Sequence, residues 1–366
     1  MNIGIPKERR ELEQRVGLTP YGVELLTGAG HTCYVEKEAG LGAGFTDYRY
    51  ERAGGHIVYS GEEVYGRADM VLKAVRPTEE ELNWLREGQV LAGFLHLAAA
   101  RRRKVEALLE KGITAIAYET IEKDDGTLPV LRTMSEVAGR MAPQLAATFL
   151  QSDHGGRGVL LGGVPGVPAA RAVVLGGGVL GTNAARAFLG LGATVSILDH
   201  NLERLYQIDR QFDGRVTTMV SYPFNVSRAT RLAEVVVGAV LTPGARAPFI
   251  VTREMVRLMK RGAVILDFSI DQGGCVETSR PTTLRDPAFT EEGVVHFCVP
   301  NVPGAVPRTA THAFNNAVWP YIRHIAEVGV EKALEEMPAL ARGVAVRDGE
   351  IVNEALAATY YAGREG

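Results

Sequence analysis

The sequence is poor in cysteine, in aromatic residues and in any excess of charge of one sign. Its 366 residues include three cysteines (Cys33, Cys275 and Cys298), an odd number without the spacing of a metal site. This usage predicts a reducing cytoplasm, no disulfide framework and no bound metal. The 40 basic and 43 acidic side chains give a net charge of −3. That balance argues against a nucleic-acid binder, because phosphate recognition needs a strong positive field.

Long hydrophobic runs are also missing. The longest candidate, Val90–Ala100, contains His96 and is followed by Arg101–Lys104. It falls short of the ~18 residues that a membrane span needs. The N-terminal segment MNIGIPKERR lacks the apolar stretch of a signal peptide. We therefore expect a cytoplasmic protein without a membrane partner.

Glycine, by contrast, is abundant and clustered. Of the 42 glycines, 12 lie between Gly155 and Gly192. Such clustering marks sharp turns and places where one backbone approaches another closely. The most unusual local geometry is therefore expected in this window.

Buried strands alternate with helices on both sides of that window. The pattern predicts a strand at Ala172–Leu175, a helix at Val179–Leu189 and a strand at Thr194–Leu198, followed by strands at Val235–Leu241 and Ala263–Phe268. The first ~130 residues alternate in the same way, with strands expected at Met1–Ile5, Thr32–Val35, Met70–Val75, Val90–Phe94 and Ala115–Tyr118. After Pro307 the pattern turns helical. The sequence thus predicts an α/β protein with two doubly wound, Rossmann-like units.

The strand ending at Leu175 is followed by a glycine motif. Gly176, Gly178 and Gly181 form GxGxxG, which is weak evidence alone but here opens a helix directly after a strand. The glycines permit a tight turn and close approach to a pyrophosphate, and the helix N-terminus favours the phosphates. Asp199, 23 residues after Gly176, ends the next strand, where a carboxylate accepts the ribose hydroxyls of NAD and repels the 2′-phosphate of NADP. A tight turn without a ligand is the alternative; we favour an NAD site.

Several polar residues interrupt apolar segments and are candidates for chemistry. His96 ends a strand, Asp271 follows another, and Lys73 lies inside a third. Because ligands of open α/β sheets bind at the carboxyl ends of strands, these positions suit a substrate site. Each of these residues also has a structural interpretation. His96 could be a hydrogen-bonded structural histidine, and Lys73 could lie at a sheet edge. Asp267, which ends the strand before Asp271, could equally be a turn or cap residue. Arg15 and Asn301 lie in loops, and a lone arginine is usually a surface charge.

The motifs together resemble the alanine dehydrogenase and transhydrogenase superfamily over nearly the whole chain. The matching segments are GIPKE, RVGLTP, FLHLAA, IAYET, MSEVAGRMAPQ, GGRGVLLGGVPGV, VVLGGGVLGTNAA, GAVLTPGARAP, IDQGGCVETSRPTT and NVPGAVPRT. The resemblance implies a discontinuous substrate domain (residues 1–130 and 306–366), an NAD-binding Rossmann domain (131–305) and a cleft between them. It further implies reversible oxidative deamination of L-alanine by NAD to pyruvate and ammonium, in a homo-hexamer.

The same resemblance assigns roles to residues of this chain. Arg15 matches an arginine that binds the substrate carboxylate, and His96 a histidine that hydrogen-bonds the reacting carbonyl or imine. Asp271 matches an acid that activates ammonia or water, and Asn301 an asparagine that contacts substrate. Positions that meet the cofactor in the family are Ser135, Gly176, Gly178, Gly181, Asp199, Arg204, Ser221, Val240 and Leu241.

One departure from the family pattern stands out. The family motif typically reads Lys-Val-Lys-Glu-Pro, whereas this chain has Lys73-Ala74-Val75-Arg76-Pro77, so a substrate-binding lysine is replaced by Val75. Lys73 shares a strand face with position 75 and could point into the same substrate site, although it is not an obvious replacement for the missing lysine. Arg76 would reach in only if a bulge shifted the register by one residue. Ser269, where alanine is usual, is a smaller departure.

Three functions remain open on the sequence. The first is an active alanine dehydrogenase or a relative that aminates another small 2-oxo acid. The second is an NAD-binding paralogue with a different substrate or weak activity, which Val75 motivates. The third, a transhydrogenase subunit, is disfavoured because that branch lacks the MSEVAGR, LHLAA and IDQGG segments found here.

Overall fold

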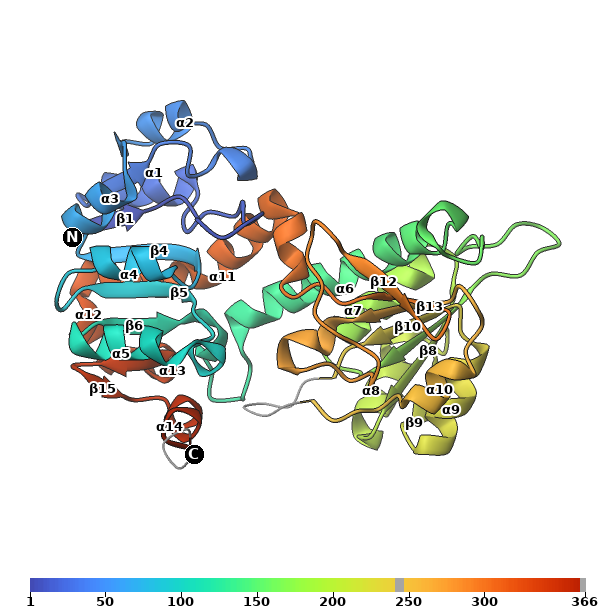
Figure 1. Cartoon of the computed structure of the whole chain (residues 1–366). Coiled ribbons are helices and arrows are strands. Elements are labelled where there is room, and N and C mark those ends of the chain that lie inside the picture. The colour runs from blue at the N-terminus through green and yellow to red at the C-terminus, as the bar shows by residue number, and fades with distance from the viewer. Residues whose placement is uncertain (241–246, 363–366) are drawn as a thin grey trace. The chain divides into compact units, whose positions relative to one another are not determined.

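The computed structural model describes residues 1–240 and 247–362, which form two compact units. Unit 1 comprises Met1–Met134 and Gly304–Gly366, and unit 2 comprises Ser135–Pro303. Unit 1 thus uses both ends of the chain (blue to teal, and red, in Figure 1), and unit 2 is built from the segment between them. Helix α6 (Pro129–Phe149) contributes residues to both units.

Unit 1 is built on an eight-stranded sheet in the order β15-β14-β6-β5-β4-β1-β2-β3. Strands β1 to β6 are parallel, and β14 and β15 are added antiparallel beyond β6. The strands are β1 (Asn2–Ile5), β2 (Thr32–Glu36), β3 (His56–Val58), β4 (Met70–Val75), β5 (Val90–Phe94), β6 (Thr114–Ala117), β14 (Val344–Arg347) and β15 (Glu350–Ile351).

Helices connect these strands and complete unit 1. They are α1 (Pro20–Gly28), α2 (Asp47–Arg52), α3 (Gly61–Arg67), α4 (Glu79–Trp84), α5 (Arg102–Glu110), α11 (Pro307–Val328), α12 (Val330–Glu336), α13 (Pro338–Arg342) and α14 (Glu354–Ala362). Short 3₁₀ turns include η2 (Leu97–Ala99) and η3 (Tyr118–Thr120).

The C-terminal segment corrects one expectation. Only helices were expected after Pro307, at Ala310–Val328, Gly329–Glu336 and Asn353–Tyr361, but β14 and β15 are strands that extend the sheet, β14 beside β6 and β15 beside β14. Figure 1 shows these red elements next to the teal strand β6. Two strands of four and two residues are too short to show a period in the sequence. β14 pairs with β6, more than 200 residues earlier, and β15 pairs with β14.

Unit 2 contains a seven-stranded sheet in the order β12-β13-β11-β10-β7-β8-β9, in which only β12 is antiparallel among the described strands. The strands are β7 (Arg171–Leu175), β8 (Thr194–Asp199), β9 (Thr217–Val220), β10 (Val235–Gly238), β11 (Val264–Asp267), β12 (Ala288–Glu291) and β13 (Val294–Phe297). The helices are α7 (Val179–Gly190), α8 (Leu202–Phe212), α9 (Pro223–Leu232) and α10 (Arg253–Arg257). Strand β10 ends three residues before the expected Leu241, which lies outside the described residues.

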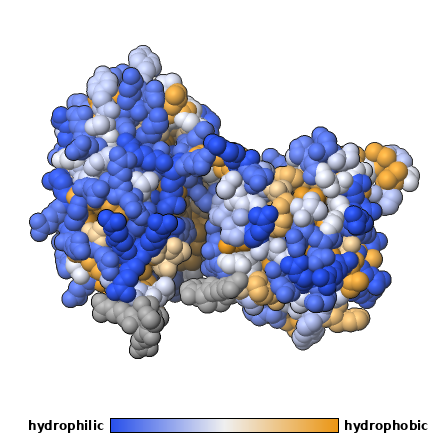
Figure 2. All heavy atoms as spheres, in the orientation of Figure 1, coloured by the Kyte–Doolittle hydropathy of each residue, from blue (hydrophilic) through white to orange (hydrophobic). Residues whose placement is uncertain are grey.

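Each unit has its own apolar core. In unit 1 Val71, Leu91 and Ala115 pack in one buried cluster. In unit 2 Val173, Val236 and Ile265 belong to another. These continuous β-branched strands are typical of parallel sheets covered on both faces. The visible outer surface is mostly hydrophilic (Figure 2). In the described part of the chain, no helix is long and apolar enough to cross a membrane.

The two units share one topology. Read across the sheets, β3-β2-β1-β4-β5-β6 and β9-β8-β7-β10-β11-β13 have the same 3-2-1-4-5-6 order. The direction of winding therefore reverses between β1 and β4 in unit 1, and between β7 and β10 in unit 2. We call the carboxyl ends of these two strand pairs the switch points, where open α/β sheets bind their ligands.

Candidate active site

The switch point of unit 2 carries the glycine motif between β7 and α7. Gly176 has a φ of +102°, and a Cβ there would lie 2.4 Å from the carbonyl oxygen of Ala239. A Cβ on Gly181 would lie 1.9 Å from the oxygen of Gly176. Both positions therefore require glycine. Gly178 differs, because its Cβ would meet only the Arg204 Nη1 atom, at 4.0 Å.

Asp199 holds this loop from the end of β8. Its Oδ2 atom accepts a hydrogen bond from the Gly177 N–H (2.7 Å), and its Oδ1 atom accepts one from the Asn201 N–H (2.8 Å). The side chain is buried. The carboxylate is thus fixed beside the glycine loop, as expected for an acid that recognises an adjacent ribose.

The other expected cofactor positions have varied surroundings. Arg204, on α8, extends its side chain over the loop, and Ser221 follows β9 with its N–H bonded to the Asp199 carbonyl oxygen (3.0 Å). Ser135 is half-buried in α6. Val240 follows β10, the neighbour of β7, whereas Leu241 lies outside the described residues. The residues around the loop fit a dinucleotide: the helix N-terminus is clear at Gly178, a cation lies over it, and an acid marks the adjacent strand end.

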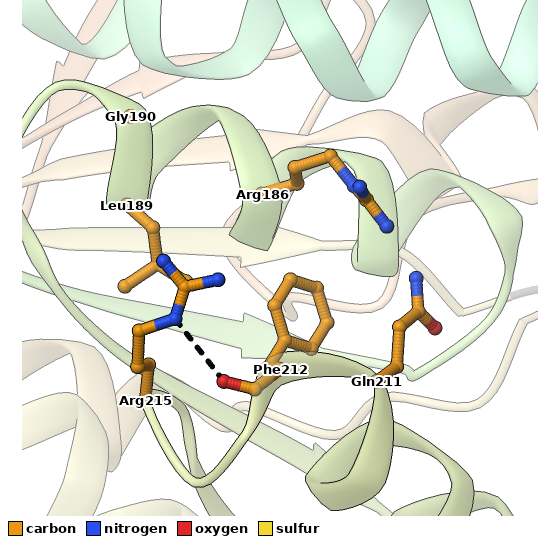
Figure 3. A pocket seen from close by; sticks show the side chains of 6 residues that line it. All are labelled: Arg186, Leu189, Gly190, Gln211, Phe212 and Arg215. Carbon is orange, nitrogen blue, oxygen red and sulfur yellow. Dashed lines mark hydrogen bonds between the residues drawn. The ribbon is translucent and has the colours of Figure 1, made fainter.

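A hollow elsewhere on unit 2 is not part of this constellation. It is lined by Arg186, Leu189, Gly190, Gln211, Phe212 and Arg215 (Figure 3). The Arg215 Nε–H donates to the carbonyl oxygen of Phe212 at 3.2 Å, the dashed line of Figure 3. This hollow reaches the C-terminal end of α7, whereas the glycine loop is at its N-terminal end. A twelve-residue helix separates its ends by about 18 Å.

Asp271 and Asn301 lie together in unit 2 beyond β11 and β13. Asp271 is exposed on the 3₁₀ turn η5 (Phe268–Gln272), and its Oδ2 atom accepts from the Asn301 N–H at 3.4 Å. Asn301 has a φ of +54°, a left-handed conformation that asparagine tolerates better than most residues. The two predicted site residues of unit 2 are therefore neighbours.

Asp267, at the end of β11, holds the turn that carries Asp271. The sequence left open whether Asp267 is a turn residue or a site residue. It is fully buried and accepts from the N–H groups of Ser269 (3.1 Å), Cys275 (3.0 Å) and Val276 (3.2 Å). Burial raises the pKa of its carboxyl above the usual value. Its hydrogen bonds fix the path of the turn that carries Asp271.

Ser269 makes a contact that alanine would not. Its Oγ atom accepts from the Val240 N–H at 3.0 Å and so ties η5 to the segment after β10. That segment begins the loop that passes the cofactor in the family the sequence resembles. The departure at Ser269 thus adds a hydrogen bond at the edge of the predicted cofactor site.

In unit 1, Arg15 is a buried, positioned cation rather than a surface charge. The Glu13 carboxylate binds it through two contacts, to Nε (2.7 Å) and Nη2 (2.6 Å), and its Nη1 atom lies 3.5 Å from the Met134 sulfur. The following residues cross β4 closely, since a Cβ on Gly17 would lie 2.1 Å from the Leu72 oxygen. Glu13 therefore fixes the guanidinium in a segment packed on the central strand β4.

His96 follows β5 in a left-handed conformation with its side chain 54% exposed. Glu119, on η3, accepts from its N–H at 2.5 Å and from the Leu95 N–H at 3.1 Å. The ring stacks on Phe94, and its Nδ1 atom is 3.9 Å from the same carboxylate. An accessible imidazole held beside a carboxylate at a strand end is suited to proton transfer.

Lys73 takes a different position from the one predicted. It is fully buried on β4, and its Nζ atom lies 2.9 Å from Glu8 and 2.5 Å from Glu81. Burial opposes its charge, but the two carboxylates outweigh burial and raise its pKa above the usual value. Tyr65 also donates to Glu81, at 3.3 Å. This closed arrangement favours a structural role and argues against Lys73 as a substrate ligand.

Strand β4 does contain the bulge on which the position of Arg76 depends. Its pairing with β5 shifts between Leu72, opposite Ala92, and Val75, opposite Phe94. Val75 is buried, at 7% exposure. The Arg76 Nη1 atom donates to the carbonyl oxygen of His96 at 2.9 Å. The guanidinium is thus brought beside the candidate catalytic histidine.

Four acidic residues were not identified from the sequence, although they position the candidate site residues. Glu13 holds Arg15, Glu119 holds His96, and Glu8 and Glu81 enclose Lys73. Glu119 lies within the IAYET motif and Glu13 lies just before the RVGLTP motif. An acidic residue within or near the quoted motifs was therefore the feature of the sequence that could have identified both. The described residues contain no cluster of three or more metal-ligating side chains.

Comparisons with known proteins cover the whole chain. Family models described as alanine dehydrogenase/PNT match it, the N-terminal domain at residues 4–138 and the C-terminal domain at residues 142–354. Similar curated proteins are the alanine dehydrogenases of Staphylococcus saprophyticus (50% identical over 358 residues) and Methanococcus maripaludis (48% over 358 residues), each covering 98% of this chain and 96% of the relative.

Solved structures agree with these matches. An L-alanine dehydrogenase structure superimposes with a TM-score of 0.95 at 47% identity, covering 99% of both chains. A transhydrogenase from Sinorhizobium meliloti, 24% identical, has a TM-score of 0.84 over 96% of this chain and all of that one, and shares the fold. The two doubly wound units, the glycine loop with its acid and the full-length similarity lead to one conclusion: the chain belongs to the alanine dehydrogenase/PNT family.

Proposed function

We propose that this chain is an NAD-dependent alanine dehydrogenase, which converts L-alanine and water reversibly to pyruvate and ammonium. The observation that carries the proposal is the accessible imidazole of His96 at the end of β5, where Glu119 fixes the His96 backbone, in a chain about half identical to curated alanine dehydrogenases over nearly its full length. NAD, when bound, supplies the hydride acceptor, and NADH the donor.

We assign roles to the residues as follows. Arg15, whose Nε and Nη2 atoms are held by Glu13, binds the substrate carboxylate with its remaining N–H donors, since a guanidinium carries five. His96 hydrogen-bonds the reacting oxygen or nitrogen and transfers a proton. Asp271 activates ammonia or water, and Asn301 contacts the substrate. The cofactor contacts are those of the glycine loop, Asp199, Arg204, Ser221, Ser135, Val240 and Leu241.

The finer features of this proposal are a cytoplasmic location and a homo-hexameric assembly. A projecting loop of unit 2, before β7, supports contact between copies, because it exposes Leu160, Val164 and Val167 (66%, 53% and 59%). Figure 2 shows hydrophobic atoms at the projecting tip that Figure 1 draws in green. Apolar side chains gathered at an exposed tip are typical of a surface that another chain covers.

A second function is favoured by one observation. Val75 is an uncharged, buried residue where the resembled family has a substrate-binding lysine. Loss of a preorganised charge commonly costs about 3 kcal/mol in a transition state. A paralogue that acts weakly, or on another small 2-oxo acid, is therefore the alternative.

One assay separates these functions. NADH oxidation is followed at saturating ammonium with pyruvate and with a panel of larger 2-oxo acids, for the wild type and Val75→Lys. Efficient wild-type turnover of pyruvate that Val75→Lys does not improve supports the alanine dehydrogenase. A Val75→Lys variant at least tenfold faster than a sluggish wild type supports the paralogue. No turnover of any 2-oxo acid, with NADH still bound, would contradict both.

A further inference from the structure

Arg76 is the first residue after β4 and so lies at the switch point of unit 1. Its Nη1 atom is 2.9 Å from the His96 carbonyl oxygen. The guanidinium of Arg76 thus contacts the backbone of His96, and the two residues follow adjacent parallel strands at their carboxyl ends. This is the edge at which an open α/β sheet binds its ligand.

The bulge in β4 explains how Arg76 reaches this place. One extra residue of β4 lies between the Leu72–Ala92 and Val75–Phe94 pairs. A bulge of this kind redirects the side chains that follow it. Lys73 lies within the bulge and is enclosed by Glu8 and Glu81, and Val75 is a buried, uncharged side chain. The cation presented beside His96 is therefore Arg76 rather than Lys73.

The surroundings of Arg76 are positively charged. The Lys104 Nζ atom donates to the Pro77 carbonyl oxygen at 2.8 Å. Burial lowers the pKa of Lys104, and the charges of Arg10 and Arg76 lower it further, so the three cations lie close enough to interact. Of the nearby carboxylates, Glu8 and Glu81 are bound by Lys73, Glu79 pairs with Arg101, and Glu119 accepts from the His96 N–H. This local field favours an anion.

We propose that Arg76 is a substrate-binding residue that holds the carboxylate of the 2-oxo acid beside His96. The inference rests on the proposed function and names the residue that compensates for the uncharged Val75. The carboxylate and the 2-oxo carbon of the substrate are directly bonded. A cation next to the histidine that acts on the 2-oxo group is therefore placed to bind the carboxylate, and its planar fork suits that group.

A purely structural role for Arg76 makes different predictions. The hydrogen bond to the His96 carbonyl oxygen would then only hold the left-handed backbone of His96. Its removal would lower kcat through a displaced imidazole while leaving carboxylate affinity unchanged. A carboxylate-binding role instead raises the KM for the 2-oxo acid and the dissociation constant of a non-reactive analogue.

The test uses the full-length enzyme and three variants: Arg76→Gln, Arg76→Lys and, as a control, Arg103→Gln. Arg103 is an exposed arginine of α5 in the same unit, so its loss matches the change in charge. Two quantities are measured: the dissociation constant of oxamate from the enzyme–NADH complex, by NADH fluorescence, and kcat and KM for pyruvate. Melting temperatures and NADH affinity confirm that each variant is folded.

Arg76→Gln is expected to raise both the oxamate dissociation constant and the KM for pyruvate about tenfold or more, the usual effect of a lost charge-assisted hydrogen bond. Arg76→Lys, which keeps the charge, is expected to recover part of this loss, and Arg103→Gln to stay within twofold of the wild type. Unchanged oxamate affinity in Arg76→Gln, or equal losses in the Gln and Lys variants, would overturn the assignment.

The design separates two failures. A wild type that turns over pyruvate, with an Arg76→Gln variant that binds oxamate normally, removes the role of Arg76 and leaves the proposed function intact. A wild type that turns over no 2-oxo acid removes the proposed function, and the assignment of Arg76 with it.

Discussion

The two units of this chain wind their strands in the same order, yet their switch points are chemically opposite. In unit 2 the carboxyl end of β7 carries glycines whose missing side chains leave the backbone accessible. In unit 1 the charged residues Glu8, Lys73 and Arg76 lie in or directly after β1 and β4, and His96 follows the next strand, β5. Topology determines where a ligand binds, and the side chains at that place determine which ligand it is.

The difference also concerns how each site is held. The glycine loop is fixed by one carboxylate, Asp199, which accepts from backbone N–H groups. The unit 1 site depends on ion pairs: Glu13 with Arg15, and Glu8 and Glu81 with Lys73. Substitutions at the unit 2 switch point should therefore alter ligand binding by changing the shape of the loop, and substitutions at the unit 1 switch point by changing its charge.

The largest effect is expected from Gly181→Ala in unit 2. The added Cβ would lie 1.9 Å from the Gly176 oxygen, so the loop and helix α7 must separate, and NADH binding should be lost at millimolar concentrations. Gly190→Ala, at the other end of the same helix, meets no atom within 4 Å and is the matched control. Isothermal titration with NADH measures both. Normal affinity in Gly181→Ala would show that this close approach is dispensable.

Lys73→Met in unit 1 should have the next largest effect, on stability. It leaves Glu8 and Glu81 buried without their cation, a loss that typically costs about 3–5 kcal/mol. The control is Lys332→Met, whose ion pair with Glu336 on α12 is exposed and worth less than ~1 kcal/mol. Urea unfolding measures both variants. If Lys73→Met is as stable as Lys332→Met but fails to bind oxamate, Lys73 is a substrate ligand after all.

A smaller effect is expected from Ser269→Ala at the edge of the cofactor site. It removes the hydrogen bond from the Val240 N–H, worth about 1 kcal/mol, so NADH should bind about fivefold more weakly. The control is Ser227→Ala, a half-buried serine of α9. An NADH affinity that is unchanged or tighter would mean that the segment after β10 keeps its path without Ser269.

Sequence reasoning recovered unit 2 better than unit 1, for a physical reason. The strand, glycine turn, helix and acid between Arg171 and Asp199 are contiguous, so local pattern determines them. The partners of Lys73 come from other segments: Glu8 follows β1, and Glu81 lies on α4. Only the folded chain brings these three together.

Backbone irregularity limited the prediction in the same unit. The sequence offered two cations, Lys73 and Arg76, that could replace the charge missing at Val75. Nothing in Lys73–Pro77 predicts the bulge that decides between them, because the bulge depends on pairing with β5. Strand β14 was missed because it is short and pairs with the distant β6. Residues whose role rests on distant pairing are thus the ones that local pattern cannot assign.

The central claim is that the unit 2 switch point binds the dinucleotide while His96, at the unit 1 switch point, transfers the proton. Its most direct test is His96→Ala, with NADH affinity and the rate of NADH oxidation at saturating pyruvate and ammonium measured on the same preparation. Because His96 transfers the proton, turnover should fall by about 10²–10⁴-fold, while NADH affinity stays within twofold of the wild type. A rate near that of the wild type, or a parallel loss of NADH binding, would contradict this division of roles.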